Sequence, residues 1–196
     1  MAHAFQLLWA GFLFMFDVRL QGFDILPDVI GYVLMFRGLT LLAPSNRYFK
    51  QAASLAPLVA AFSLLDVWQP IPQGGGLLTV GGLSLRTPLG LALTLAGMAL
   101  FVLNLILVSR ICLGIAEMAE GQGQKDLAEA ATSRWGEYKS MHILLIIIWP
   151  LAAAFPAIGW VGPVALLAVG IAVYFSMMGL MRQAQSYLED PGKAAG

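Results

Sequence analysis

The sequence predicts an all-α membrane protein, a polytopic helix bundle with about six transmembrane segments. Its composition is the first reason, because 59% of the 196 residues are apolar and only 11% are charged. The mean hydropathy of +0.80 agrees with this balance, which ordinary soluble domains do not have. The second reason is a set of apolar stretches that reach or approach the length needed to cross a bilayer.

The distribution of positive charge is the third reason, and it predicts the orientation. With the apolar stretches taken as spans, nine of the eleven Lys and Arg residues fall at the termini and the even-numbered connections, and only Arg19 and Arg86 fall opposite. Cytoplasmic segments of membrane proteins carry an excess of Lys and Arg, so we expect both termini in the cytoplasm. The nine are Arg37, Arg47, Lys50, Arg110, Lys125, Arg134, Lys139, Arg182 and Lys193.

The expected segments belong to one integral membrane domain, 1–196. No basic residue precedes the first segment and no small-x-small cleavage pattern follows it, so we expect an uncleaved helix and not a signal peptide. Helix starts are indicated by Ser45 as an N-cap, by Thr87-Pro88 and by Gly162-Pro163. The segments are about 4–20, 25–42, 47–69, 88–118, 142–155 and 162–182.

The first two segments are short. Their uninterrupted apolar runs, 4–16 and 25–36, hold 13 and 12 residues. At about 1.5 Å per residue, neither run alone covers a hydrocarbon core of about 30 Å. We expect two short or tilted spans, and the alternative is a re-entrant hairpin from the cytoplasmic side. Both alternatives leave the orientation of the later segments unchanged.

A small hairpin is expected between the third and fourth segments. Two short β-prone runs, 77–80 and 83–86, flank Gly81-Gly82, a pair suited to a two-residue turn with positive φ. The pattern predicts an extracytoplasmic β-hairpin or ordered loop.

The longest polar connection, 117–140, is expected in the cytoplasm. Apolar residues recur in it at helical spacing among charged ones, which predicts an amphipathic helix over about 125–140. We expect this helix to lie on the membrane surface, and the alternative is a docking helix for a cytoplasmic partner. Its apolar positions are Leu127, Ala131, Trp135 and Tyr138.

An acidic patch is predicted on the extracytoplasmic side, a candidate polar vestibule. In one interpretation Asp28, just after Pro27, stabilises a helix dipole, Asp24 closes the preceding turn, and Arg19 or Arg86 neutralises a neighbouring carboxylate. In the other, the patch binds a cation, relays protons or holds a polar headgroup. Its residues are Asp17, Arg19, Asp24, Asp28, Asp66 and Arg86.

Asn104 lies deep in the fourth segment between apolar residues. Such an amide must be hydrogen-bonded, so it is expected to join helices, with a pore-lining role as the alternative.

Other classes of function find little support. The only histidines are His3 and His142, the only cysteine is Cys112, and no paired metal-ligand spacing or nucleophile motif occurs. The formal net charge is zero, so a nucleic-acid partner is not expected. We therefore expect no catalytic residue, metal or cofactor.

One segment resembles a group of proteins. Leu26-Pro27-Asp28-Val29-Ile30-Gly31-Tyr32 resembles an LPD-x-IGY signature that follows the first apolar stretch in small, uncharacterised bacterial membrane proteins. Arg37-Gly38-Leu39 and the run 46–52 are also similar to that pattern. The resemblance implies a multi-span protein of the bacterial inner membrane and no particular activity.

The sequence thus favours a non-enzymatic accessory, assembly or regulatory component of a membrane complex. The alternative is a small-solute or ion transporter, or a substrate-binding subunit of one, with an outward-facing acidic vestibule. The expected partners are the lipid bilayer, other membrane subunits or a second copy, and a cytoplasmic partner at 117–140.

Overall fold

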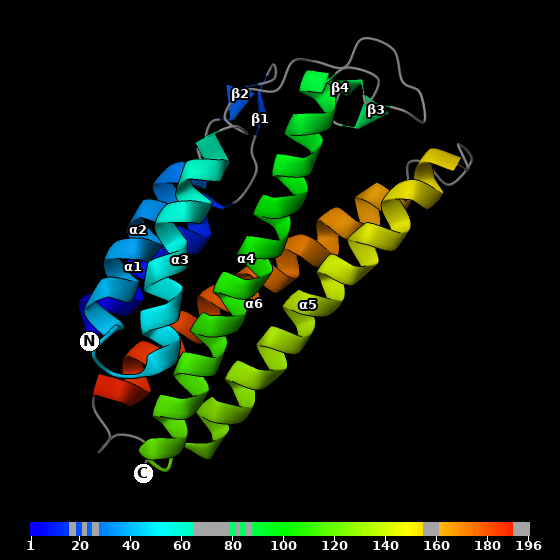
Figure 1. The fold of residues 1–196 in the computed structure, drawn as a ribbon. Coiled ribbons are helices and arrows are strands. Elements are labelled where there is room, and N and C mark those ends of the chain that lie inside the picture. The colour runs from blue at the N-terminus through cyan, green and yellow to red at the C-terminus, as the bar shows by residue number, and fades with distance from the viewer. Residues whose placement is uncertain are drawn as a thin grey trace. The chain divides into compact units, whose positions relative to one another are not determined.

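The computed structural model describes residues 1–15, 19–20, 23–24, 28–64, 79–80, 83–84, 88–154 and 161–189. Over these residues the chain forms six α-helices and two pairs of two-residue strands, which confirms the predicted all-α class (Figure 1). The chain divides into two compact units, Met1–Ile111 and Cys112–Gly196. The helices are α1 (Ala2–Phe14), α2 (Asp28–Leu42), α3 (Arg47–Ser63), α4 (Pro88–Gly121), α5 (Lys125–Ala154) and α6 (Val161–Glu189).

In the first unit, α2 packs against both α1 and α3 (Figure 1). The buried residues of α1 and α2 follow the same helical pattern, so each helix turns one continuous stripe inward. The stripe of α1 consists of Ala4, Phe5, Leu8, Gly11 and Phe12, and that of α2 of Gly31, Tyr32, Met35, Gly38, Leu39 and Leu42.

Three glycines bring the backbones of α1 and α2 into close contact. A Cβ atom added to Gly11 would lie 2.9 Å from the carbonyl oxygen of Gly31, and one added to Gly31 would lie 2.8 Å from that of Gly11. One added to Gly38 would lie 2.7 Å from the carbonyl oxygen of Ala4. The pairs show that the helices run antiparallel. Only glycine fits at these positions, because the atoms it faces belong to backbone and cannot rotate away.

The start of α3 differs by one residue from the sequence prediction. Asn46, not Ser45, is the N-cap, and its Oδ1 accepts a hydrogen bond of 3.0 Å from the amide of Phe49. Asn46 has the extended backbone of a cap residue, whereas the amide of Ser45 still donates to the carbonyl of Leu42 in the preceding turn.

Two short antiparallel strand pairs follow the predicted turns. Strands β3 (Thr79–Val80) and β4 (Leu83–Ser84) pair with Val80 opposite Leu83, so two residues connect them, as the Gly-Gly pair predicts. The connecting glycines lie outside the described residues. Strands β1 (Arg19–Leu20) and β2 (Phe23–Asp24) form a similar pair that the sequence analysis missed.

In the second unit, α5 is one uninterrupted helix. The amphipathic helix predicted over about 125–140 and the segment predicted over 142–155 are its two halves. No glycine or proline lies between Lys139 and Trp149, so nothing in the sequence ends the helix at that point. Gly123, with a φ of +74°, provides the turn between α4 and α5.

Helices α5 and α6 pack against each other in antiparallel orientation (Figure 1). Glu137 contacts Ser176, while further along α5 a Cβ atom on Gly170 would lie 3.7 Å from the sulfur of Met141. Residue numbers along α6 therefore decrease where those along α5 increase, as in an antiparallel pair.

Candidate functional site

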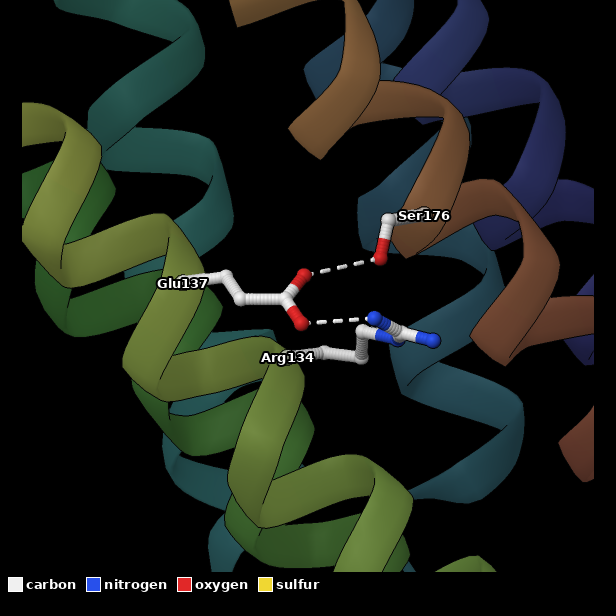
Figure 2. Close-up of polar contacts among 3 residues, drawn as sticks. All are labelled: Arg134, Glu137 and Ser176. Atoms are coloured by element: carbon white, nitrogen blue, oxygen red, sulfur yellow. Dashed lines mark hydrogen bonds and ion pairs between the residues drawn. The ribbon is translucent and has the colours of Figure 1, made fainter. Parts of the chain in front are cut away.

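A polar network joins α5 to α6, and Figure 2 shows its three side chains. Arg134 and Glu137 lie one turn apart on α5, and Arg134 Nη1 donates to Glu137 Oε1 at 2.6 Å. From α6, Ser176 Oγ donates to the other carboxylate oxygen, Oε2, at 3.1 Å. The carboxylate thus holds a charge partner on its own helix and a hydroxyl on the neighbouring one.

The network is only partly screened from its surroundings. The side chains of Arg134 and Glu137 are 41% and 38% exposed. In water an ion pair this exposed contributes about 0–1 kcal/mol, so its main effect there is to fix the orientation of the carboxylate toward Ser176. Near hydrocarbon, an ion pair costs less free energy than a single charge, because its net charge is zero.

An aromatic cluster lies beside this network. Tyr138 is fully buried, and its ring centroid lies 4.2 Å from that of His142 and 6.1 Å from that of Tyr174 on α6. Trp135 stacks on Tyr138 at 6.5 Å. His142 Nδ1 lies 2.9 Å from the carbonyl oxygen of Tyr138. A carbonyl oxygen only accepts, so the neutral imidazole carries its proton on Nδ1.

The acidic and imidazole groups of this arrangement have partners within the chain. Glu137 already receives two donors, and His142 bonds to the backbone of its own helix. Within the described part of the chain, no group of three or more His, Cys, Asp or Glu residues could hold a metal ion.

The predicted acidic vestibule is described only in part. Asp17, Asp66 and Arg86 lie outside the described residues. Arg19 and Asp24 are direct cross-strand partners in the β1–β2 pair, which places opposite charges at neighbouring positions.

Asp28 of the predicted vestibule is the first residue of α2 and is half-buried. This confirms its predicted place in the first helical turn, where a carboxylate stabilises the helix dipole. Binding of a ligand at the vestibule stays a prediction.

The other predicted positions lie on long helices. Asn104 is half-buried in α4. On α5, Leu127, Ala131 and Tyr138 are buried and Trp135 is half-buried. Most of this stripe is therefore covered by protein, and of the four side chains only Trp135 keeps area for a headgroup interface. The surface-lying orientation stays a prediction that depends on Trp135.

Sequence reasoning missed the Glu137 network. The spacing of Arg134 and Glu137, three residues apart on a helix, was visible as a pair that can interact. The contact with Ser176 could not be predicted, because Ser176 lies 39 positions from Glu137 and meets it only through the register of two helices.

No protein-family model, curated protein or solved structure matches the chain. The class of protein therefore rests on the fold, an all-α chain in which two described helices, Pro88–Gly121 and Val164–Tyr187, are long and apolar enough to cross a membrane. The resemblance carried by residues 26–32 stays a prediction.

We expect Glu137→Gln and Ser176→Ala to be non-additive. Ser176→Ala removes the donor of the interhelical hydrogen bond, and Glu137→Gln removes the charge of its acceptor. The net contribution of such a bond is about 0.5–1.5 kcal/mol. The double variant should therefore be less destabilised than the sum of the two single variants. Thermal unfolding of the purified protein in detergent measures this coupling.

Ser186→Ala provides the matched control, since Ser186 is an exposed serine of α6 whose hydroxyl donates to the carbonyl of Gln183 on the same helix. Combined with Glu137→Gln, it should give an additive loss. Additive losses for Ser176→Ala as well would show that the interhelical bond does not form.

Proposed function

We propose that the chain is a multi-pass protein of the bacterial inner membrane that serves as a non-enzymatic accessory, assembly or regulatory component of a membrane complex. The observation that carries the membrane placement is the exposure of its most apolar helices. In the apolar windows of α4 and α6, only 17% and 28% of residues are buried. The core helix of a soluble protein has the opposite character, because its apolar side chains are covered.

The exposed apolar side chains are large. On α4, Leu89 and Met98 are 68% and 62% exposed, and on α6, Val164 and Leu167 are 63% and 65% exposed. The second half of α5 adds a run of exposed residues, 143–147. Apolar area on this scale is unfavourable in water and favourable against lipid or the helices of a partner.

Helix length agrees with this placement for two helices. Residues 88–109 of α4 and 161–181 of α6 contain no charged residue. At about 1.5 Å per residue these stretches measure roughly 33 Å and 32 Å, close to a hydrocarbon core of about 30 Å. Both helices continue beyond the uncharged stretch, toward Arg110 and Arg182.

The other helices need assistance to cross. Helices α1 and α2 have 13 and 15 residues, or roughly 20 and 22 Å, so two short spans and a re-entrant hairpin both remain compatible with their length. In α5 the uncharged stretch 140–154 is roughly 22 Å long. Crossing by α5 would bring the Arg134–Glu137 pair to the edge of the hydrocarbon, where the pair is neutral as a whole.

An assembly role is preferred because the described polar groups are largely engaged within the protein, while the apolar helix faces are not covered. Exposed faces of this kind can contact lipid or neighbouring subunits. The transport alternative is favoured by one observation, the network in which a carboxylate of α5 meets Ser176 inside the uncharged stretch of α6. Ionisable groups at membrane depth commonly mark solute or proton pathways.

The topology tests the membrane placement. We expect the chain to stay in the membrane fraction through alkaline carbonate extraction. Reporter fusions should place Gly123 and the C-terminus in the cytoplasm and the loop 74–82 outside, because the positive-inside rule orients short connections. A periplasmic signal at Gly123, or release by carbonate, would contradict the proposal.

The two functions are separated by a second measurement. Purification in mild detergent should recover a membrane subunit in fixed stoichiometry if the chain is an assembly component. Thermal stabilisation of the isolated chain by a small solute or cation, with no partner present, would instead favour transport.

A further inference from the structure

Two arginines from different helices converge on one tyrosine in the first unit. Arg47 and Tyr48 open α3, and Arg110 lies on α4. The guanidinium carbons of Arg47 and Arg110 lie 4.9 Å and 5.8 Å from the centroid of the Tyr48 ring. Arg47 Nη2 also donates to the Tyr48 hydroxyl at 3.1 Å. We call these three residues the Arg–Tyr cluster.

The chemistry of the Arg–Tyr cluster suits an anion. The two guanidinium carbons cannot be more than 10.7 Å apart, the sum of 4.9 and 5.8 Å. Each guanidinium presents a planar fork of donors that matches phosphate oxygens. The Tyr48 hydroxyl, which accepts from Arg47, can still donate its own proton to an acceptor. The cluster therefore gathers two guanidinium groups and one hydroxyl around a single ring.

The depth of the Arg–Tyr cluster matches that of lipid headgroups. Arg110 follows Pro88 by 22 residues, so it lies roughly 33 Å along α4 from the helix start. This distance is about the thickness of the hydrocarbon core, which brings Arg110 to its far boundary. Tyrosine and arginine are enriched at that level, and the charge distribution places it on the cytoplasmic side.

The surface next to Arg110 favours a lipid over a free phosphate. Ile106 and Val102 precede Arg110 by one and two helical turns, on the same side of α4, and are 38% and 52% exposed. They lie on the membrane side of Arg110, where an acyl chain would continue from a headgroup held by the cluster.

We propose that Arg47, Tyr48 and Arg110 bind the phosphate of an anionic phospholipid of the cytoplasmic leaflet, with an acyl chain along Val102 and Ile106. The proposal rests on the membrane placement given above. The phosphate oxygens accept from both guanidinium groups, and the net negative charge of the lipid strengthens its attraction to this basic side of the membrane. Zwitterionic lipids lack that net charge and bind more weakly.

Thermal unfolding in detergent, titrated with phosphatidylglycerol or phosphatidylcholine, tests the site. Phosphatidylglycerol should raise the melting temperature of the wild type more than phosphatidylcholine does. In the Arg47→Gln/Arg110→Gln variant its apparent Kd should rise at least tenfold. The matched control, Lys125→Gln/Arg182→Gln, removes the same charge elsewhere and should change the Kd less than twofold. An equal loss in both variants would overturn the site in favour of a general charge effect.

Competition by small phosphates distinguishes a lipid from a free phosphate. Glycerol phosphate and inorganic phosphate should not compete with phosphatidylglycerol at the concentrations where the lipid saturates the protein. An equal rise in melting temperature with either phosphate would identify a free phosphate as the ligand and overturn the lipid proposal. If the double variant does not fold, Arg110→Gln replaces it, with the same tenfold criterion.

Carbonate extraction separates the two proposals. Membrane retention without a preference for phosphatidylglycerol overturns the lipid site alone, whereas release of the wild type overturns the membrane placement on which it rests.

Discussion

Replacement of Gly38 by alanine is expected to destabilise the α1–α2 pair by about 1–3 kcal/mol, the usual cost of overpacking a close contact. The added Cβ would lie 2.7 Å from the carbonyl oxygen of Ala4, so the two helices must separate. Gly38→Leu should prevent the pair from forming. Thermal unfolding in detergent measures the first effect, and the yield of folded protein measures the second.

Gly97→Ala is the matched control for Gly38→Ala. Gly97 also lies within a helix, but a Cβ there meets no atom within 4 Å. Alanine is the better helix former by about 1 kcal/mol, so the control should be as stable as the wild type or slightly more stable. Equal melting temperatures for the two variants would show that α1 and α2 do not touch at Gly38.

The same contacts explain part of the segment that carries the resemblance to other membrane proteins. In 26–32, Gly31 faces the backbone of Gly11, and Tyr32 is 2% exposed. These two positions serve the packing of α2. Asp28 serves the start of that helix.

Tyr138→Ala is expected to destabilise the α5–α6 pair by about 3–5 kcal/mol, as for other large aromatic residues removed from a core. The buried ring contacts His142 on its own helix and Tyr174 on α6, so its loss leaves a cavity between the two helices. Thermal unfolding, with the rate of limited proteolysis between α5 and α6, should report the loss.

Two variants control for Tyr138→Ala. Tyr138→Phe keeps the ring and should retain most of the stability, which separates packing from the hydroxyl. Ile146→Ala removes a large apolar side chain that is 57% exposed on the same helix, and should cost little in detergent. A loss for Ile146→Ala as large as that for Tyr138→Ala would mean that Ile146 is covered by a partner.

Several features of the fold followed from the sequence because they depend on neighbouring residues. Mainly apolar runs predicted helices where α1, α2, α3, α4 and α6 lie, since helical hydrogen bonds join residues close in the sequence. The predicted amphipathic helix and the predicted fifth segment together correspond to α5. The Gly81-Gly82 pair predicted the register of β3 and β4 for the same reason. The start of α3 was predicted within one residue, because Ser45 and Asn46 are both good caps and only the preceding turn selects between them.

The contacts between helices could be identified only from the tertiary structure. The sequence gives seven-residue spacing between Ala4 and Gly11 and between Gly31 and Gly38, but many small residues recur in so apolar a chain. Only the register of two antiparallel helices shows that these pairs face each other. The continuity of α5 was also missed, because the change from polar to apolar residues near Met141 was taken as a boundary although no breaker lies there.

The sequence by itself determined the helical class, because composition and local hydrogen bonding suffice for it. The asymmetry of charge across a membrane depends on the assumed spans and stays a prediction. The tertiary structure decided which polar residues meet. Glu137 and Ser176 are 39 positions apart, and Tyr48 and Arg110 lie on two different helices, 62 positions apart. The physical reason is that side chains on different helices meet only when packing fixes the rotation and register of each helix, and those are set by contacts far apart in the chain.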